Sequence, residues 1–453
     1  MSADAGTNAG QQVPQKEIRR VVASSFIGTA IETYDFILYG SAAALIFGPL
    51  FFANLSPALA TIASFATLAT GYLARPLGGL LFGYLGDRLG RRWVLMTTVI
   101  LMGAGTGLIG LLPTQAQIGV AAPILLVALR VIQGIAHGGE WGGGVLMIAE
   151  FVEPRKRGMY TGLGQGGLSA GAVIATLVMA LVTTLPEDQL FSWGWRMPFL
   201  FSFVLVALGI YLRLRIDESP LFLEMEKRAE PRGRLSAMLG HLRPLGRGIL
   251  ASLPPTMSAA FFGTFAVGYA VQAGNSRSTV LLALATSWVL GSFTTPIYGM
   301  LSDRVGRRPV FVASVVGVAI LTYPFMLAMK SGSTVLLFVA FIVLFSFVTP
   351  ASQGTVASLL SELFPTELRS TGVSLAPLLA AVAAGFTPVV SASLLAASAG
   401  RLGRVVALIS GVCVVAAVAV WRGRESAGSS LAEDPASAVV VEQADLPATR
   451  ATT

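Results

Sequence analysis

The decapeptide GYLGDRLGRR at Gly83–Arg92 recurs as GMLSDRVGRR at Gly299–Arg308, 216 residues further along the chain. A second pair of related stretches follows at nearly the same spacing: EFVEPRKRG begins at Glu150 and ELFPTELRSTG begins at Glu362. Two matching pairs in the same order indicate that the chain consists of two halves built alike. Such internal repeats are frequent in helical membrane proteins.

The composition places both halves in a membrane. Of the 453 residues, 54% are hydrophobic and only 12% are charged, whereas a soluble domain carries about 25% charged residues. Apolar runs of about 20 residues predict membrane-spanning helices. We expect an all-α integral membrane protein with twelve such helices, near residues 21–52, 59–85, 93–113, 120–149, 158–184, 195–213, 248–272, 277–301, 310–329, 333–361, 371–397 and 403–421.

One long polar stretch, residues 214–247, divides the predicted spans into two groups of six. We therefore expect one six-helix bundle over residues 21–213, a cytoplasmic linker over 214–247, and a second six-helix bundle over 248–422. The tails, residues 1–20 and 423–453, are expected to be disordered and cytoplasmic.

Lys and Arg gather in alternate connections between the spans. The positive-inside rule places these connections, and both termini, on the cytoplasmic side of an inner membrane. Arg277, Lys330, Arg401 and Arg404 are exceptions. Topology thus accounts for the net charge of +8, and no nucleic-acid partner is expected. The single cysteine, Cys413, excludes internal disulfides and cysteine-rich metal sites, so we expect no metal and no cofactor.

Charged residues inside the spans are the candidates for function. The stretch FIGTAIETYDFILYGSAAALIF, from Phe26 to Phe47, is apolar except around Glu32 and Asp35. On a helix these acids lie within about 60° of Tyr39. A charged side chain at the bilayer centre costs about 2.5–3.5 kcal/mol. We therefore expect both acids to face a cavity, to contact cations or to carry protons.

Two arginines share the first half with these acids: Arg75 and Arg130 lie within predicted spans, and Glu140 adds a third acid. With His137 neutral, buried acids outnumber buried arginines by one, and an unpaired buried carboxylate favours its protonated form. Asp35 is preferred as the proton site because it lies deeper in its span. His137 taken alone is better explained as a packed neutral histidine than as a proton site. The predicted proton-coupling residues are Asp35, Glu32, Glu140 and His137.

The same helix faces carry candidate substrate ligands. A guanidinium holds a carboxylate through two parallel hydrogen bonds, and the second half offers polar groups but almost no charge in its spans. The alternative is that the buried charges only pair to hold helices together. The predicted substrate-binding residues are Arg130, Arg75, Tyr39, Tyr72, Gln133, Trp141, Tyr269 and Gln353.

Several motifs resemble one known superfamily. GDRLGRR, its second copy and RVIQG from Arg130 are similar to signatures of the major facilitator superfamily. IETYDFILYG, RPLGG, GGEWGG, WGWRMPF and DESPLF resemble its metabolite:proton symporters, the group with proline/betaine, shikimate, α-ketoglutarate and citrate carriers. The resemblance covers about residues 20–422 and implies the major facilitator fold. Thr33, His137 and a missing Tyr–Gln pair depart from the usual patterns, so the resemblance names no substrate.

The repeated loop is the candidate gate. Its glycines permit tight turns, and Asp87 can face the positive end of a neighbouring helix. The resemblance implies that Asp87 joins a cytoplasmic charge cluster that breaks when the inward gate opens. The alternative, that the arginines only set topology, does not explain Asp87. The predicted gating residues are Asp87, Arg88, Arg91, Glu150, Asp303 and Arg307.

These observations predict a secondary active transporter that takes up a small anionic or zwitterionic metabolite, such as a carboxylate or betaine, with a proton. We expect a monomer whose partners are the substrate, protons and the bilayer. No nucleophile set, metal set or phosphate loop is apparent, so no enzyme activity is expected. The alternatives are a proton-coupled exporter of an amphiphilic compound, against which the buried arginines argue, and a metabolite sensor. The direction of transport, and proton against sodium coupling, stay open.

Overall fold

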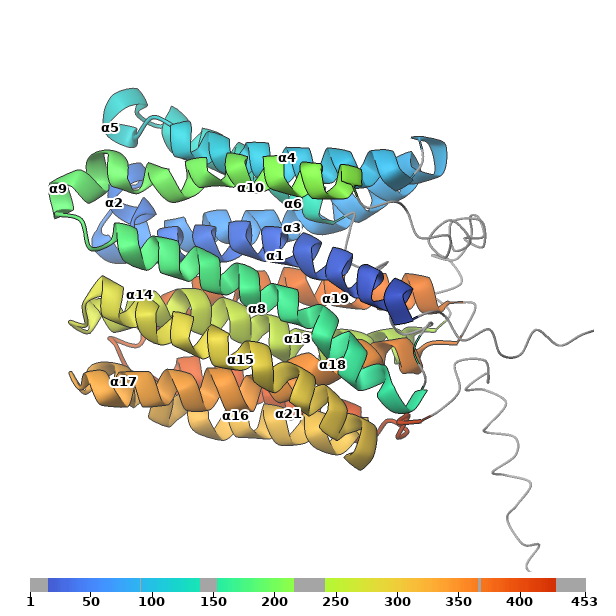
Figure 1. The fold of residues 1–453 in the computed structure, drawn as a ribbon. Helices are drawn as coiled ribbons and strands as arrows, with labels where there is room; N and C mark the ends of the chain where they lie inside the picture. The colour runs from blue at the N-terminus through green and yellow to red at the C-terminus, as the bar shows by residue number, and fades with distance from the viewer. Residues whose placement is uncertain are drawn as a thin grey trace, which may run out of the picture.

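The structure is a computed structural model that describes residues 15–89, 91–138, 152, 154–215, 241–365 and 368–428. Over these ranges the chain forms long helices that run side by side, and the described part contains no strand (Figure 1). Nine helical stretches within it are long and apolar enough to cross a membrane. Met96–Leu111 and Ala121–His137 are shorter apolar helices.

The first half contributes six long helices and several short segments. Its elements are α1 (Gln15–Leu45), α2 (Phe47–Phe51), α3 (Pro57–Leu89), α4 (Arg91–Leu111), α5 (Gln115–Ile118), α6 (Ala121–His137), η1 (Pro154–Lys156), α8 (Arg157–Val182), α9 (Glu187–Gln189), η2 (Leu190–Gly194) and α10 (Arg196–Arg215).

The second half repeats the plan with more interrupted helices. Its elements are α13 (Leu242–Ala260), η3 (Phe261–Phe265), α14 (Ala266–Gln272), α15 (Arg277–Val305), α16 (Arg307–Lys330), α17 (Thr334–Phe341), η4 (Ile342–Val348), α18 (Thr349–Leu363), α19 (Arg369–Gly385), α20 (Thr387–Ala397) and α21 (Gly403–Trp421). The expected all-α fold is confirmed.

Four spans are interrupted without leaving the helical path. η2, η3 and η4 are π-helical segments that join flanking α-helices, and such bulges are frequent at functional sites. The span from α19 to α20 breaks at Phe386, where Pro388 stands in the first turn of α20. Proline lacks a backbone N–H, so it fits readily in the first turn of a helix, where that N–H would have no helical partner.

The repeated loop makes the tight turn that its glycine predicts. In the second copy, Gly306 has φ 115° and joins α15 to α16. A side chain at this position would be strained, because only glycine adopts such a φ freely. The loop therefore sets α15 and α16 antiparallel with almost no spacer.

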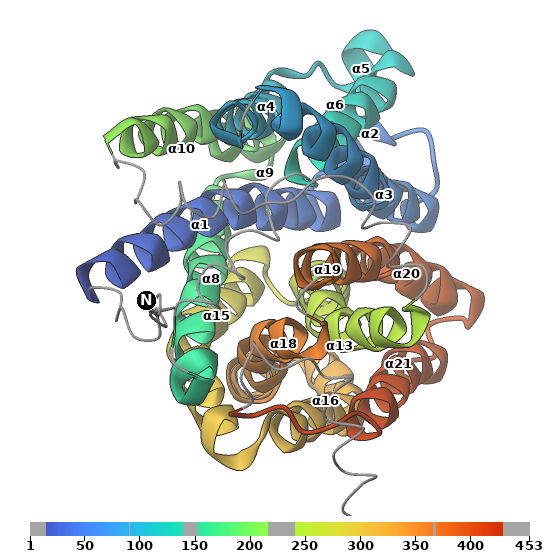
Figure 2. The ribbon, with the colours of Figure 1, turned by 90° about the vertical axis from the view of Figure 1, so that its right-hand side faces the viewer.

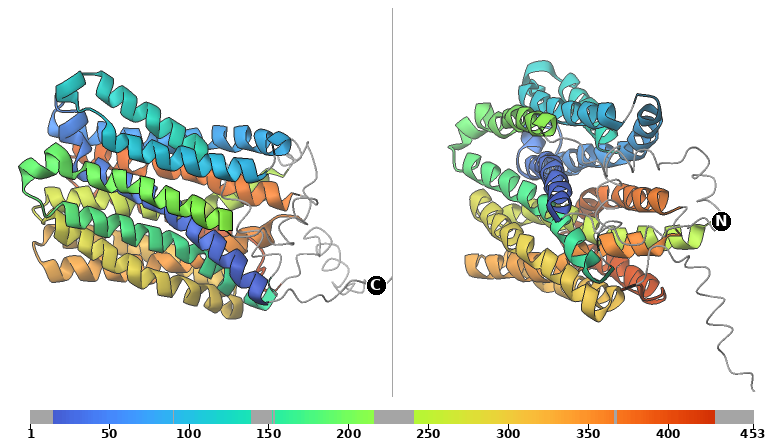
Figure 3. Two further views of the ribbon diagram at one scale, coloured as in Figure 1. Left: turned by 45° about the horizontal axis from the view of Figure 1, so that its top comes forward. Right: turned by 45° about the vertical axis from the view of Figure 1, so that its right-hand side comes forward.

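The two halves form two adjoining groups of helices, as the end-on view shows (Figure 2). Helix α8 packs against α15, and α3 packs against α19 and α20, so helices of both halves meet along the middle of the molecule. Helix α1 crosses this middle and also contacts η3. The other orientations show the same grouping (Figure 3).

Candidate functional site

The two acids of α1 are buried and face different neighbours. Asp35 is 3% exposed, and its Oδ1 accepts a hydrogen bond from Ser202 Oγ of α10 at 3.2 Å. Its Oδ2 has no hydrogen-bond donor among the described residues. Glu32 Oε2 lies 3.8 Å from His137 Nδ1 of α6. Glu32 of α1 thus lies beside His137 of α6, whereas Asp35 contacts α10.

Arg75 of α3 and Arg130 of α6 are buried beside these acids, but they contact aromatic rings. Arg130 Cζ lies 4.2 Å from the ring centroid of Tyr39 and 4.5 Å from that of Phe36. Arg75 Cζ lies 4.5 Å from the Phe36 centroid and 4.3 Å from that of Tyr72. Within the described ranges, no carboxylate lies within ion-pairing distance of either guanidinium.

One edge of the Arg130 guanidinium is hydrogen-bonded, and the other has no acceptor among the described residues. Nη1 donates to Gln133 Oε1 at 3.2 Å, and Gln133 Nε2 donates to Thr106 Oγ1 of α4 at 2.5 Å. Nε and Nη2 have no acceptor among the residues that the structure describes. These two N–H groups form the fork that binds a carboxylate through parallel hydrogen bonds. This edge therefore has the hydrogen-bond donors that a carboxylate needs.

Glycines bring the two arginine-bearing helices into backbone contact. A Cβ on Gly134 of α6 would collide with the carbonyl oxygen of Gly71, and one on Gly78 of α3 would collide with that of Ile135. A Cβ on Gly71 would lie 2.6 Å from Arg130 Nε. Small residues permit close approach of membrane helices, and here they allow the Arg130 side chain to pass across α3.

Near the arginine site, the second half contributes packing contacts rather than charged side chains. A Cβ on Gly385, the last residue of α19, would overlap the Tyr72 ring, and one on Gly40 of α1 would lie 2.5 Å from Thr264 Oγ1 of η3. The π-helical segment η3 and the break after α19 thus both adjoin the arginine site. This agrees with the prediction that charge sits in the first half.

The other predicted ligands are not all gathered there. Tyr269 of α14 stacks on Phe265 and lies 5.9 Å from Lys330 Nζ, at the end of α16. Gln353 is half-buried on α18, and no contact links it to the arginines. Glu140 and Trp141 lie outside the described residues.

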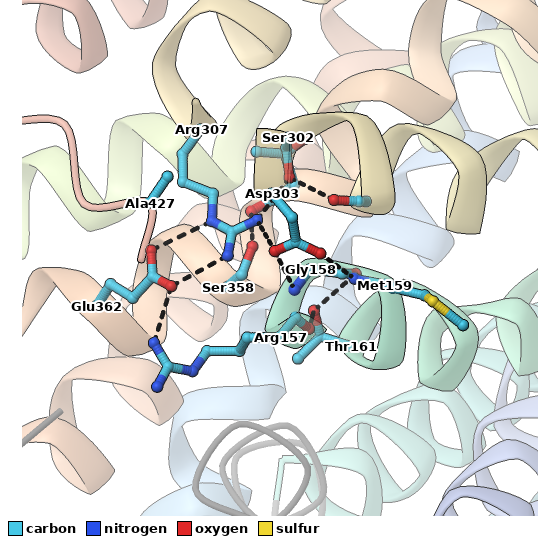
Figure 4. A network of polar contacts seen from close by, with 12 residues as sticks. Arg157, Gly158, Met159, Thr161, Ser302, Asp303, Arg307, Ser358, Glu362 and Ala427 are labelled. Atoms are coloured by element: carbon cyan, nitrogen blue, oxygen red, sulfur yellow. Dashed lines mark hydrogen bonds and ion pairs between the residues drawn. The ribbon is translucent and has the colours of Figure 1, made fainter. Parts of the chain in front are cut away.

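A second charged cluster joins the halves at one end of the bundle (Figure 4). Asp303 accepts hydrogen bonds from the backbone N–H groups of Gly158 and Met159 at 2.9 and 3.0 Å. It caps the N-terminus of α8, where the helix dipole favours an anion. Arg307 Nη1 lies 2.7 Å from Asp303 Oδ1. The second copy of the repeated loop therefore makes the helix-end contact that we predicted for Asp87.

Glu362 is the centre of this cluster. It lies at the end of α18 and pairs with Arg307 of its own half at 3.2 Å and with Arg157 of the other half at 3.0 Å. All three side chains are at most 3% exposed. The predicted gating residues Asp303 and Arg307 thus belong to one network. The side chains of Asp87, Arg88, Arg91 and Glu150 lie outside the described part of the chain.

The segment after α21 is part of the same network. Glu425 accepts hydrogen bonds from the backbone N–H groups of Arg307 and Arg308, at 2.7 and 3.1 Å, and so caps α16. Ser426 Oγ donates to Glu362 Oε2 at 2.7 Å. We expected disorder from residue 423 onward, but residues 423–428 pack against α16 and α18 through these contacts.

Sequence reasoning missed several members of both clusters. Phe36, Thr106 and Ser202 are apolar or small residues in apolar spans, so they carry no signal of their own. Glu362 could have been found from the sequence, because it begins the repeated stretch whose first copy begins at Glu150. Glu425 had none, because it follows the last span.

The chain has two repeated six-helix halves, with buried charges near their junction and a charged cluster that joins them at one end. These features are typical of a polytopic membrane carrier of small molecules. Residues 21–241 match the family described as "Sugar (and other) transporter", and residues 248–442 match "Major Facilitator Superfamily". The chain belongs to the major facilitator superfamily. It is a multi-pass membrane transporter, and the expectation that it is not an enzyme is confirmed.

Curated relatives are metabolite carriers. The chain is 36% identical to the shikimate transporter of Escherichia coli K12, over 90% of this chain and 95% of that one. It is 32% identical to the glycine betaine/proline/ectoine/pipecolic acid transporter OusA of Dickeya dadantii, over 84% and 78%. The expected likeness to metabolite:proton symporters is confirmed.

Solved structures show the same fold. The D-xylose–proton symporter superposes with a TM-score of 0.73 at 20% identity, covering 91% of this chain and 99% of that one. The inward-open xylose transporter XylE from E. coli gives 0.70 at 21% identity, covering 91% and 98%. This likeness confirms the two-bundle architecture.

Proposed function

We propose that this transporter carries a small anionic or zwitterionic metabolite, such as a carboxylate or a betaine, into the cell together with a proton. The observation that carries the proposal is the Nε/Nη2 edge of Arg130, which is buried and has no hydrogen-bond acceptor among the described residues. Leaving a buried cation without an anion is costly. A substrate carboxylate on this edge offsets that cost.

Coupling to protons rests on the acids of α1. Asp35 lies in the electrostatic neighbourhood of Arg130 and keeps one oxygen without a donor in the described part of the chain. A carboxylate so placed is stabilised either by a cation or by a proton. When the substrate's anion occupies Arg130, Asp35 loses that cation's stabilisation and takes a proton instead. Substrate and proton therefore enter together.

The end of the bundle that carries the second charged cluster serves as the inward gate. Asp303, Arg157 and Glu362 connect the halves there, so opening this end requires their contacts to break. We place this end, and both termini, in the cytoplasm of an inner membrane, following the Lys and Arg distribution. Helix α1 begins and α21 ends at this same end (Figure 1), and the carrier works as a monomer.

Uptake into proteoliposomes tests the function. The purified protein is reconstituted, and labelled carboxylates and betaines are supplied with an imposed pH gradient, an imposed sodium gradient or neither. We expect at least one panel member to accumulate only when the pH gradient is present. Accumulation driven by sodium alone would overturn the coupling, and export of panel members would overturn the direction.

Binding measured without a gradient separates substrate recognition from coupling. The same panel is titrated into detergent-solubilised protein while its thermal unfolding is followed. A carboxylate that binds should raise the midpoint temperature, because ligands that bind only the folded state stabilise it. Preference for an uncharged amphiphile over every carboxylate would favour the exporter.

A further inference from the structure

One aromatic ring is shared by both buried arginines. Phe36 of α1 lies 4.5 Å, centroid to Cζ, from Arg75 and equally far from Arg130. Each guanidinium has a second ring, Tyr72 for Arg75 and Tyr39 for Arg130. The five side chains therefore alternate as ring, cation, ring, cation, ring. The two like charges lie no more than about 9 Å apart, because both are measured from one centroid.

This arrangement is unexpected beside two acids. Phe36 directly follows Asp35 in the chain, and Glu32 lies one turn earlier on the same helix. Buried arginines normally pair with buried carboxylates. Here neither guanidinium forms an ion pair with any described carboxylate, and both lie against the ring of Phe36 instead.

We propose that Phe36 is a positioning residue that keeps Arg75 and Arg130 from pairing with Glu32 and Asp35, and so maintains a two-point site selective for substrates with two anionic groups. The proposal rests on the proposed function and specifies its substrate class. Arg130 offers its Nε/Nη2 fork, and Arg75 Nε is likewise without an acceptor in the described structure. Two available guanidiniums at this spacing suit a short dicarboxylate.

Pairs of probes that differ by one charge measure what the second anionic group of the ligand contributes to binding. Malonate, succinate and glutarate are each compared with the half-amide of the same length, which keeps the shape and removes one charge. Dissociation constants are measured on detergent-solubilised protein with no pH gradient, so a failure of proton coupling or of transport direction leaves the readout intact. We expect at least one diacid to bind about tenfold more tightly than its half-amide, as for one additional charge-assisted hydrogen bond.

Three variants test the role of the ring. Phe36→Leu fills most of the volume but has no π face, and should weaken the best diacid about tenfold and its half-amide about threefold, because two cation–π contacts serve the diacid and one serves the half-amide. Phe36→Tyr keeps the ring and should restore both affinities. Phe201→Leu removes an exposed ring of α10 that does not contact the arginines, and should change neither.

The outcome decides between positioning and mere packing. A diacid-to-half-amide ratio that falls in Phe36→Leu and returns in Phe36→Tyr supports the proposal. An equal loss for both probes, with the ratio unchanged, would mean that Phe36 only fills space. If no diacid is preferred over its half-amide by the unaltered protein, the two-point site is wrong, even where a monocarboxylate binds and the proposed function stands.

Discussion

Buried guanidiniums decide the chemistry of this site at the scale of single residues. Gln133 accepts a hydrogen bond from one edge of the Arg130 guanidinium, and the rings of Phe36 and Tyr39 lie against it, while its remaining edge has no described acceptor. An ammonium cannot reproduce that geometry, because it is a compact charge without a planar fork. The identity of the residue should therefore matter more than its charge.

Replacing Arg130 tests this directly. Arg130→Lys keeps the charge and should weaken carboxylate binding at least about tenfold, since one of two charge-assisted hydrogen bonds is lost. Arg130→Ala should abolish binding. Isothermal titration of the best carboxylate from the panel gives both values, with Arg401→Lys, at an exposed position, as the control. Full affinity in the Lys variant would show that Arg130 acts only as a point charge.

Asp35→Asn separates binding from coupling. An amide imitates the protonated acid, so the variant should exchange substrate across the membrane but fail to accumulate it under a pH gradient. Both activities are measured in one liposome preparation. If Asp35→Asn accumulates normally and Glu32→Gln does not, the proton site is Glu32. If both variants accumulate normally, neither acid is the coupling group.

Contacts between helices position the site at the scale of elements. Helices α3 and α6 touch backbone to backbone through Gly71, Gly78 and Gly134, and this contact sets where Arg75 and Arg130 lie. Glycine costs helix stability relative to alanine, so its use in these interiors is explained by the close approach. The sequence motifs RPLGG and RVIQG thus combine an arginine with the glycine that makes room.

Adding one methyl group should disturb the site without unfolding the bundle. In Gly71→Ala, the new Cβ lies 2.6 Å from Arg130 Nε, so the guanidinium must move. We expect carboxylate affinity to fall roughly tenfold or more, as for overpacking that costs about 1–3 kcal/mol. Gly411→Ala in α21 is the matched control, because nothing lies within 4 Å of its added Cβ. Equal affinity in both variants would contradict the assignment.

Features that a local stretch of sequence encodes were predictable, whereas features that arise when distant segments pack together were not. The spans were predictable because each is an apolar run, and Asp35, Arg75 and Arg130 stood out because charge is costly inside such runs. The ring of Phe36 and the hydroxyls of Thr106 and Ser202 were not predictable, since the same residue types occur throughout the spans. Gly385 and Thr264 join the site only through the packing of one half on the other.

At the scale of the whole molecule, different ion pairs hold the two halves together at the two ends of the bundle. At the end bearing Asp303, the pair that Glu362 forms with Arg157 of the other half is buried. At the opposite end, Arg277 pairs with Glu187 at 3.0 Å, but the Glu187 side chain is 70% exposed. Exposed pairs contribute about 0–1 kcal/mol, whereas removing one partner of a buried pair costs about 3–5 kcal/mol. The buried end should therefore dominate the balance between conformations.

Two charge-removing variants test this asymmetry. Glu362→Gln should shift the carrier toward the inward-open state, and Glu187→Gln should leave the balance nearly unchanged. Single cysteines placed on the cytoplasmic side in a Cys413→Ala background report accessibility to a membrane-impermeant thiol reagent. Equal labelling in both variants would show that the buried network is not a gate.

Glu362 serves three elements at once: Arg157 of α8, Arg307 of α16, and Ser426 beyond α21. Its contacts cannot be released singly, because each partial release strands a charge away from water. We therefore expect these contacts to break together, against a large enthalpic barrier, when the halves separate at this end. Turnover should rise steeply on warming, and a carrier shortened after Trp421, lacking Glu425 and Ser426, should show a gentler Arrhenius slope.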